Sequence, residues 1–204
     1  MNDSRGTMNA GTVAGAASAE SSAANARLVE RFYTAFGRRD VDAMLGCYHP
    51  QVVFSDPVFG TLAAADAAAM WRMLNGRARD LRVEFRDVKA NEHHGRAHWE
   101  AWYTFAATGR AVHNRIDAEF HFADGLIVRH IDRFSLWRWS AMVLGAKGAL
   151  LGWVPSVRGA IRAQAAKGLA AFRAGRARSR RVEAKMGDAP PAAVVPAAVA
   201  ASRT

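Results

Sequence analysis

The pattern of apolar and polar positions changes twice along the chain and predicts helices, then a sheet, then helices again. Apolar residues recur at helical spacing from Arg27 to Gly37, and Asp40 caps a second short helix over 40–48, whose apolar positions include Tyr48. A short strand over 51–56 and a third helix over 63–74 follow. We therefore expect the ordered part of the chain to begin at Arg27.

From Leu81 onward the apolar period becomes two, which is typical of half-buried strands. Four strands are expected, over 81–90, 96–107, 111–122 and 126–137. Each connection contains a glycine, as a tight turn with positive φ requires. Helices followed by an antiparallel meander predict an α+β fold rather than a parallel wound sheet.

Strand parity predicts which side chains face the interior. On the strand over 111–122, Asn114 shares the inward face with apolar residues, while charged residues alternate outward. The inward face predicted for the last strand comprises Leu126, Val128, His130, Asp132, Phe134 and Leu136. Two titratable groups in an apolar face are unfavourable unless they are hydrogen-bonded or beside water. A cavity lined by His130, Asp132 and the inward-facing Tyr103 is the expected explanation.

Both ends of the chain differ from the middle in composition. Residues 1–25 and the Ala/Pro-rich 183–204 contain few large apolar groups, so we expect both segments to be disordered. The formal charge of +10 resides largely between Arg158 and Arg181, on a basic helical extension over 141–182. The extension is expected to be solvated, with weak contact to an anionic surface as the alternative and no specific nucleic-acid binding.

The single cysteine, Cys47, excludes an internal disulfide and a cysteine-based metal site. One free thiol fits a reducing compartment, so a cytoplasmic location is expected. Without a run of eighteen apolar residues, no membrane-spanning helix is expected. The histidines lack the neighbours of a compact zinc site, and no phosphate loop occurs, so we expect neither a metal nor a cofactor.

Two segments resemble a known family. FYTAFGRRDVDAMLGCYHPQVVFSDPVFG is similar to the opening of ketosteroid isomerases, and DGLIVRHIDRFSLWRW resembles the last strand of SnoaL-like proteins. Both belong to the nuclear-transport-factor-2-like superfamily, and the resemblance covers about residues 27–140. It implies a cystatin-like cone over 26–140, in which a curved antiparallel sheet wraps around the N-terminal helices. It also implies a homodimer through the outer face of the sheet, where Trp102 is expected.

The resemblance places Asp56 at the position of the isomerases' general base, a carboxylate that moves a proton between carbons. The alternative is that Asp56 only turns the chain before Pro57, which aspartate does well. The isomerase oxyanion hole does not carry over, because Phe32 and Ala118 occupy its positions and neither donates a hydrogen bond.

The replacement polar set is His130, Asp132 and Tyr103. With Asp56, the first two are candidate catalytic groups, and a buried structural His130–Asp132 pair is the alternative. The candidate substrate contacts are Tyr103, Trp71, Phe32, Asn114 and Phe134. We expect a hydrophobic small molecule as ligand, and a cofactor-free isomerase, cyclase or hydrolase acting on a carbonyl or epoxide compound. A non-catalytic module that binds a ligand or partner is the competing hypothesis.

Overall fold

The computed structural model describes residues 6–77 and 80–187. Its elements in chain order are α1 (Gly6–Gly37), α2 (Val41–Leu45), β1 (Tyr48–Asp56), β2 (Gly60–Ala63), α3 (Ala64–Arg77), β3 (Arg82–Ala90), β4 (His94–Phe105), β5 (Arg110–Ala123), β6 (Leu126–Arg133), α4 (Leu136–Leu144), α5 (Ala146–Leu151) and α6 (Pro155–Gly187). Helices precede and follow one sheet, so the α+β prediction is confirmed.

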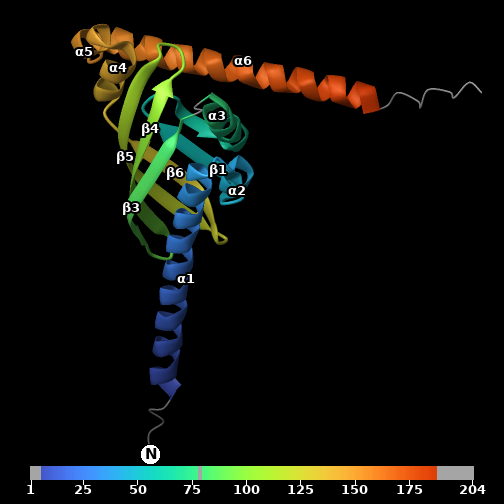
Figure 1. Cartoon of the computed structure of the whole chain (residues 1–204). Helices are drawn as coiled ribbons and strands as arrows, with labels where there is room; N and C mark the ends of the chain where they lie inside the picture. Colours follow the sequence, from blue (N-terminus) through green and yellow to red (C-terminus); the bar gives the residue numbers. More distant parts are fainter. Residues whose placement is uncertain (1–5, 78–79, 188–204) are drawn as a thin grey trace, which may run out of the picture.

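The six strands form one curved sheet in the order β2-β1-β6-β5-β4-β3. Every neighbouring pair is antiparallel except β1 and β6, which run parallel and bring the first and last strands together at the centre. The sheet curves around the C-terminal half of α1, with α2 and α3 beside it (Figure 1). This is the expected cone.

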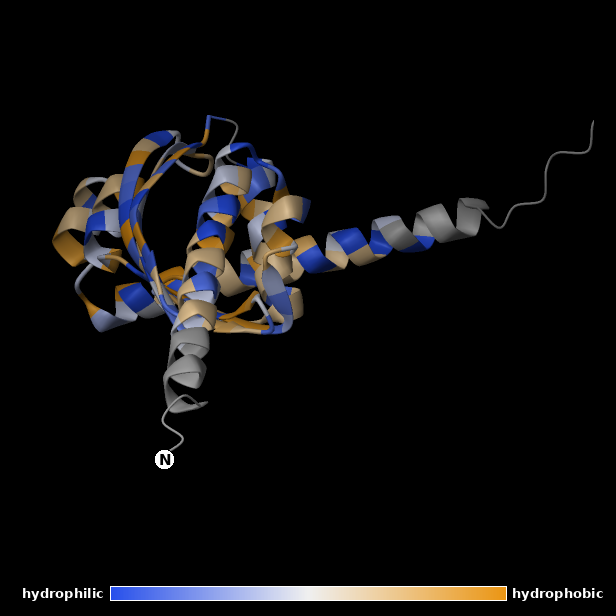
Figure 2. Cartoon of the chain, turned by 90° about the horizontal axis from the view of Figure 1, so that it is seen from below, coloured by the Kyte–Doolittle hydropathy of each residue, from blue (hydrophilic) through white to orange (hydrophobic). Residues whose placement is uncertain are grey.

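The core lies between α1 and the concave face of the sheet. One face of the C-terminal part of α1 is buried, with Val29, Phe32 and Tyr33 among its members. On β5 the burial alternates along the strand, so that Ile116 and Phe120 face inward as the period of two predicted. Orange and blue positions alternate along the strands in the same way (Figure 2).

Several expected boundaries are wrong. Helix α1 begins at Gly6 rather than Arg27, because its alanine-rich first part has high helix propensity and extends from the anchored second part. The last strand ends at Arg133, since Ser135 accepts a hydrogen bond from the Arg138 N–H and caps α4. Strand β2 was not expected, and α6 continues to Gly187. The rest of the predicted disordered tail, 188–204, lies outside the described residues.

The parity expected for the start of β6 is also wrong. The register between β5 and β6 shifts between His121 and Phe122, so Ile127 is fully buried and Leu126 and Val128 are only partly buried. Such a bulge inserts a residue and reverses the alternation locally. Beyond it, His130 and Asp132 face inward as predicted.

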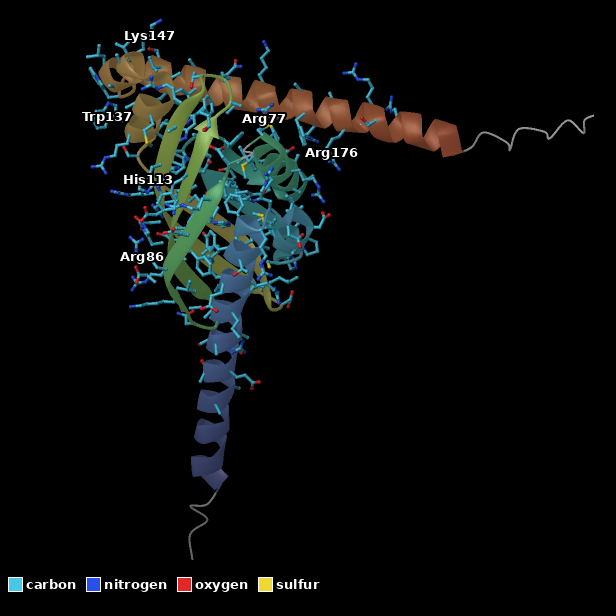
Figure 3. The ribbon with its side chains drawn as sticks, viewed as in Figure 1. Arg77, Arg86, His113, Trp137, Lys147 and Arg176 are labelled. Carbon is cyan, nitrogen blue, oxygen red and sulfur yellow. The ribbon has the colours of Figure 1, made fainter. Side chains whose placement is uncertain are left out.

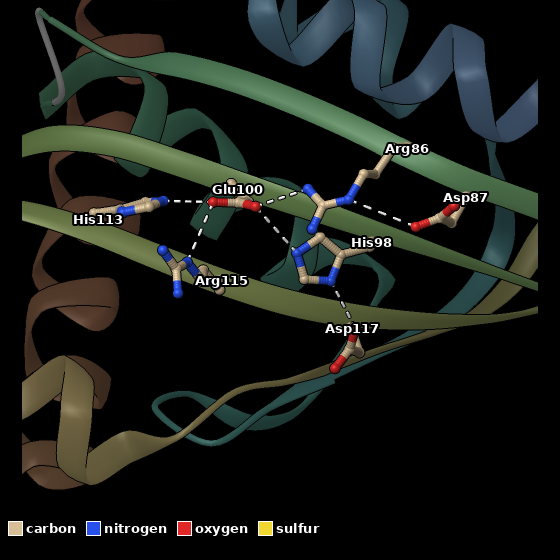
Figure 4. A network of polar contacts seen from close by, with 7 residues as sticks. All are labelled: Arg86, Asp87, His98, Glu100, His113, Arg115 and Asp117. Atoms are coloured by element: carbon tan, nitrogen blue, oxygen red, sulfur yellow. Dashed lines mark hydrogen bonds and ion pairs between the residues drawn. The ribbon is translucent and has the colours of Figure 1, made fainter.

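The outer face of the sheet carries an ion-pair network centred on Glu100 (Figure 4). Arg86 Nη1 lies 2.7 Å and His113 Nε2 2.5 Å from its two carboxylate oxygens, and Arg115 lies nearby. Hydrogen bonds from Arg86 and His113 are the main causes that lower the pKa of Glu100 to about 2. Trp102 stacks on the His113 ring at 4.4 Å, so it lies on the outer face as predicted.

Candidate functional site

A chain of hydrogen bonds runs through the interior of the cone. Trp71 Nε1 donates to Tyr48 Oη at 3.0 Å, and Tyr48 Oη lies 2.7 Å from His130 Nδ1. His130 Nε2 lies 3.0 Å from Asp132 Oδ1, which also accepts a hydrogen bond from Trp99 Nε1. All five side chains are buried, and they come from α3, β1, β6 and β4.

The direction of this chain follows from the groups that can only donate or only accept. The Asp132 carboxylate only accepts, so the neutral form of His130 carries its hydrogen on Nε2 and donates it to Asp132. His130 Nδ1 is then an acceptor, and Tyr48 Oη, which accepts from the Trp71 indole, donates to it. Every donor then has an acceptor, which is what a stable buried polar network requires.

Aromatic rings enclose His130 completely. The centroids of Phe32, Tyr48, Phe54, Trp71 and Phe120 lie between 4.5 and 6.2 Å from that of the imidazole. The expected contacts Phe32 and Trp71 therefore pack around His130 in the core, and His130 has no exposed surface. Any part that His130 plays in proton transfer has to pass through Asp132 or Tyr48.

Asp56 lies at the end of β1, where the chain turns into β2. Its Oδ1 accepts hydrogen bonds from the backbone N–H groups of Val58 and Phe59 at 2.9 and 2.5 Å. Burial raises the pKa of this carboxyl to about 7, with a smaller increase from the charge of Asp132, against the lowering effect of the amides. Asp56 thus turns the chain and is also a carboxyl poised to exchange a proton near neutral pH.

Tyr103 lies near the end of β4 and accepts a hydrogen bond from Trp139 Nε1 of α4 at 2.9 Å. Burial raises the pKa of its hydroxyl, the hydrogen bond from Trp139 lowers it, and the charge of Asp56 raises it. Since the indole only donates, the hydroxyl hydrogen of Tyr103 remains available to an acceptor. The phenol is therefore a hydrogen-bond donor that senses the charge of Asp56.

Two more polar groups inside the cone have no partner among the described residues. Asn114 is 9% exposed and makes no side-chain hydrogen bond, and it lies opposite Ala101, between Trp99 and Tyr103 of β4. Tyr33 Oη is buried without a partner, and burial together with the charge of Asp132 raises its pKa. Buried polar groups without partners are uncommon, so the Tyr33 hydroxyl and the nearly buried Asn114 amide are candidates for contact with a ligand.

The C-terminal helices cover the end of the cone at which β1 finishes and β4 turns into β5 (Figure 1). Helix α4 provides Trp139 to Tyr103, and Arg162 Nε of α6 donates to the Pro57 carbonyl at 3.0 Å. Phe134, another expected contact, is partly buried just before α4. These helices therefore lie beside both Asp56 and Tyr103.

Asp56, Asp132, His130, Tyr103 and Asn114 all lie on the inward side of the cone, but aromatic rings, rather than the expected cavity, surround His130. Electrostatic effects link them in series, because the charge of Asp132 raises the pKa of Asp56 and that of Asp56 raises the pKa of Tyr103. The sequence did not indicate the site residues Tyr33, Tyr48 and Trp139. The available signal for Tyr48 was that a tyrosine in an apolar pattern buries a hydroxyl group. Tyr48 was expected to lie on a helix and instead begins β1, so its contact with His130 was missed.

Two surface hollows lie apart from this cluster. One of about 430 Å³ lies at the edge between β3, β4 and β5, and one of about 300 Å³ lies between α1 and α2. Neither is lined by Asp56, Tyr103 or His130. Within the described part of the chain, no group of three or more His, Cys, Asp or Glu residues is arranged to hold a metal ion.

Comparisons with known proteins agree with this architecture. A candidate polyketide cyclase from Xanthomonas campestris pv. campestris is 25% identical, with 60% of this chain and 98% of that one covered and a TM-score of 0.52. An LEH-like epoxide hydrolase from M. tuberculosis is 19% identical over 66% of this chain and 98% of its own, with a TM-score of 0.52.

A candidate SnoaL-like polyketide cyclase from Jannaschia sp. CCS1 has a TM-score of 0.54 at 14% identity, over 61% of this chain and 94% of its own. No curated protein matches the chain. The SnoaL-like domain family matches residues 29–130, which is half of the chain and spans α1 to β6. The chain therefore belongs to the SnoaL-like family of the nuclear-transport-factor-2-like superfamily.

Proposed function

We propose that the cone binds a hydrophobic small molecule and that Asp56 acts on it as a general base without a cofactor. One observation carries this proposal: burial raises the pKa of Asp56 to about 7, in a cone that also holds Tyr103, whose hydroxyl hydrogen is available and whose pKa responds to the Asp56 charge. A carboxylate is a stronger base when its pKa is raised, and it is half ionised at a pH equal to that pKa.

The chemistry that fits these groups is proton transfer at a carbon beside a carbonyl group. Asp56 removes the proton, Tyr103 donates a hydrogen bond to the carbonyl oxygen as it becomes negative, and Asp56 returns the proton to a second carbon. For an epoxide, Asp56 takes a proton from the attacking water and Tyr103 donates to the opening oxygen. The partnerless Asn114 amide provides a further contact for a substrate oxygen.

In this proposal His130 and Asp132 act as a unit behind Asp56. The Asp132 charge raises the pKa of Asp56, while His130 and Trp99 hold the Asp132 carboxylate in place. The 25% identity with the candidate polyketide cyclase supports a polyketide-like carbonyl compound as substrate.

A non-catalytic binding module is the second candidate. The observation that favours it is the complete enclosure of His130, together with the two loop amides that already occupy the Asp56 carboxylate. In that case Tyr103 and Asn114 orient a ligand and no bond changes.

The test is a set of small carbonyl compounds and epoxides incubated with the protein in D₂O and followed by NMR. The proposal predicts deuterium incorporation or ring opening, with a rate that rises through an apparent pKa near 7. Asp56→Asn should lower the rate at least about a hundredfold, while the exposed Asp124→Asn serves as the matched control. Binding that Asp56→Asn leaves intact, with no turnover by the wild type, would assign the cone to the non-catalytic module.

The homodimer through the outer face of the sheet is also part of the proposal. It is supported by Trp102, which lies among charged groups on the outer face. The Trp102 ring stacks on the His113 ring, and the Arg82 guanidinium lies 4.0 Å from the centre of the Trp102 ring. Aromatic residues are enriched at such interfaces. Light scattering should give twice the chain mass for the wild type and the chain mass for Trp102→Ser; a monomeric wild type would contradict it. A cytoplasmic location stays a prediction.

A further inference from the structure

Exposed apolar side chains gather on the helices after the sheet. Of the six large hydrophobic residues that are exposed in the described part of the chain, one is Val53 of β1. The other five, which we name the apolar cap, are Trp137, Leu144, Leu150, Leu151 and Trp153. Leu150 and Trp153 are 72% and 68% exposed. Large apolar side chains exposed together on one part of the surface indicate an interaction surface.

The cap is a fixed structure. Trp137 Nε1 donates to the Ala149 carbonyl and Trp153 Nε1 to the Leu150 carbonyl, each at 2.9 Å. Helices α4 and α5 pack so closely that a Cβ atom on Gly148 would lie 2.0 Å from the Ser140 carbonyl oxygen. Because both indole N–H groups are satisfied internally, the rings can enter an apolar phase without leaving an unpaired donor.

Basic residues surround and continue the cap. Lys147 is exposed on α5, and Figure 3 shows it pointing away from the body at the same end of the molecule as Trp137. From Pro155 to Arg181, α6 contains no acidic residue. Its exposed cations without an acidic partner among the described side chains are Arg158, Arg162, Lys167, Arg176, Arg178 and Arg181, of which Arg162 donates to the Pro57 carbonyl and Arg176 lies over the Phe172 ring.

The body of the protein holds α6 in line with the cap. Leu169 is buried against the core, and Arg173 forms an ion pair with Asp66 of α3. The helix therefore begins at the cap, crosses α3 and projects beyond the domain (Figure 1). Cap and helix together present apolar and cationic groups along one end of the molecule.

We propose that the apolar cap and α6 bind the surface of an anionic lipid bilayer. Tryptophan and leucine favour the boundary between headgroups and acyl chains, and lysine and arginine are attracted to the negative surface. None of the described helices is apolar enough over a sufficient length to cross a membrane, so the binding is peripheral. A nucleic acid would use the cations and leave the cap exposed, and a second copy would bring like charges together.

The test measures binding to vesicles of phosphatidylcholine alone and of phosphatidylcholine with 30% phosphatidylglycerol, at two salt concentrations. We expect much tighter binding to the anionic vesicles, a blue shift of tryptophan fluorescence and weaker binding at high salt. The cap variant Leu150→Gln/Trp153→Gln should bind at least about tenfold more weakly. Val53→Thr, which removes the exposed apolar group outside the cap, should bind as the wild type does.

The charge variant is Lys167→Gln/Arg178→Gln/Arg181→Gln. Its affinity for anionic vesicles should fall about a hundredfold, at about fivefold for each cation near the surface. Its matched control, which loses the same charge from the exposed strand positions Lys89, Arg96 and Arg129, should bind as the wild type does.

Three outcomes would overturn the proposal. The first is equal affinity for neutral and anionic vesicles, and the second is equal affinity of the cap variant and the wild type. The third is a protein that binds neither kind of vesicle. It would instead form a dimer that the cap variant lacks, or bind a duplex oligonucleotide in a salt-dependent way. Circular dichroism of the variants checks their fold, and since all positions changed are exposed, wild-type helicity is expected.

Discussion

The buried hydrogen-bond chain makes a sharp prediction for two tyrosine-to-phenylalanine substitutions. Both hydroxyl groups are buried, but Tyr48 Oη lies between Trp71 Nε1 and His130 Nδ1, whereas Tyr33 Oη has no partner. Tyr48→Phe therefore breaks two hydrogen bonds in the interior and Tyr33→Phe breaks none. Because the chemical change is the same, each variant is the control for the other.

The two changes differ in expected magnitude. Without the Tyr48 hydroxyl, the Trp71 N–H and His130 Nδ1 are each left buried without a partner, at about 1–3 kcal/mol per group. Tyr48→Phe should thus lower the free energy of unfolding by about 2–6 kcal/mol, a large part of the ~5–15 kcal/mol of a typical domain. Tyr33→Phe removes an unsatisfied hydroxyl, so it should leave stability unchanged or raise it.

Urea unfolding followed by circular dichroism measures both effects, with the midpoint compared at equal slope so that the difference reports stability alone. Equal destabilisation by the two substitutions would refute the hydrogen-bond assignment. Destabilisation by Tyr33→Phe alone would mean that Tyr33 Oη has a partner in solution and that Tyr48 does not hold the chain together.

Three further predictions concern other parts of the molecule. The pKa of Glu100 is lowered from its ordinary value of 4.5 to about 2. Its ion pairs therefore stabilise the fold fully above pH 4.5, and this stabilisation is lost as the pH falls toward 2. Glu100→Gln should lower the melting temperature at about pH 7, and should lower it much less at about pH 2.5. Asp56 has a pKa raised from 3.8 to about 7, so its ionisation destabilises the fold progressively as pH rises between these values. In urea unfolding, Asp56→Asn should gain stability relative to wild type from pH 4 to 8, by at most about 4 kcal/mol; a constant difference would contradict the raised pKa. Gly148→Ala should lower the melting temperature, because its Cβ would collide with α4. Gly159→Ala is the control: its Cβ would have no atom within 4 Å, so the change should stabilise the protein by about 0.5–1 kcal/mol. Equal effects of the two substitutions would contradict the close contact between α4 and α5.

The layers of the fold were predictable because strand parity is a local property. On β5, residues one apart lie on opposite faces, so the alternation near Ile116 identified the buried side without knowledge of any partner strand. The same property failed at the start of β6, since the bulge opposite Phe122 depends on how two strands register. No pattern within 126–133 alone reveals it.

For the candidate site, the sequence could predict only what a single strand or turn determines, which is the direction in which a side chain points. Asp56 and the inward direction of His130 followed from the sequence, and the structure places both inside the cone. The partners that give them their properties come from elsewhere: Tyr48 is 82 positions from His130, and Trp139 is 36 positions from Tyr103. Single-sequence patterns contain no information on such pairs, so the enclosure of His130 could not be foreseen.

Helix α4 takes part in both proposals, and its geometry allows them to be tested separately. Trp137 belongs to the exposed cap while Trp139, two residues later and therefore about 200° around the helix, contacts Tyr103. Leu150 and Trp153 lie after α4, and the Trp153 indole donates to the Leu150 carbonyl. Substituting this pair should therefore weaken lipid binding at least about tenfold and leave the pH dependence of the Asp56 reaction unchanged. Loss of both would mean that the cap also supports the cone, because α4 contacts Tyr103 and α6, which follows the cap, contacts Pro57 beside Asp56.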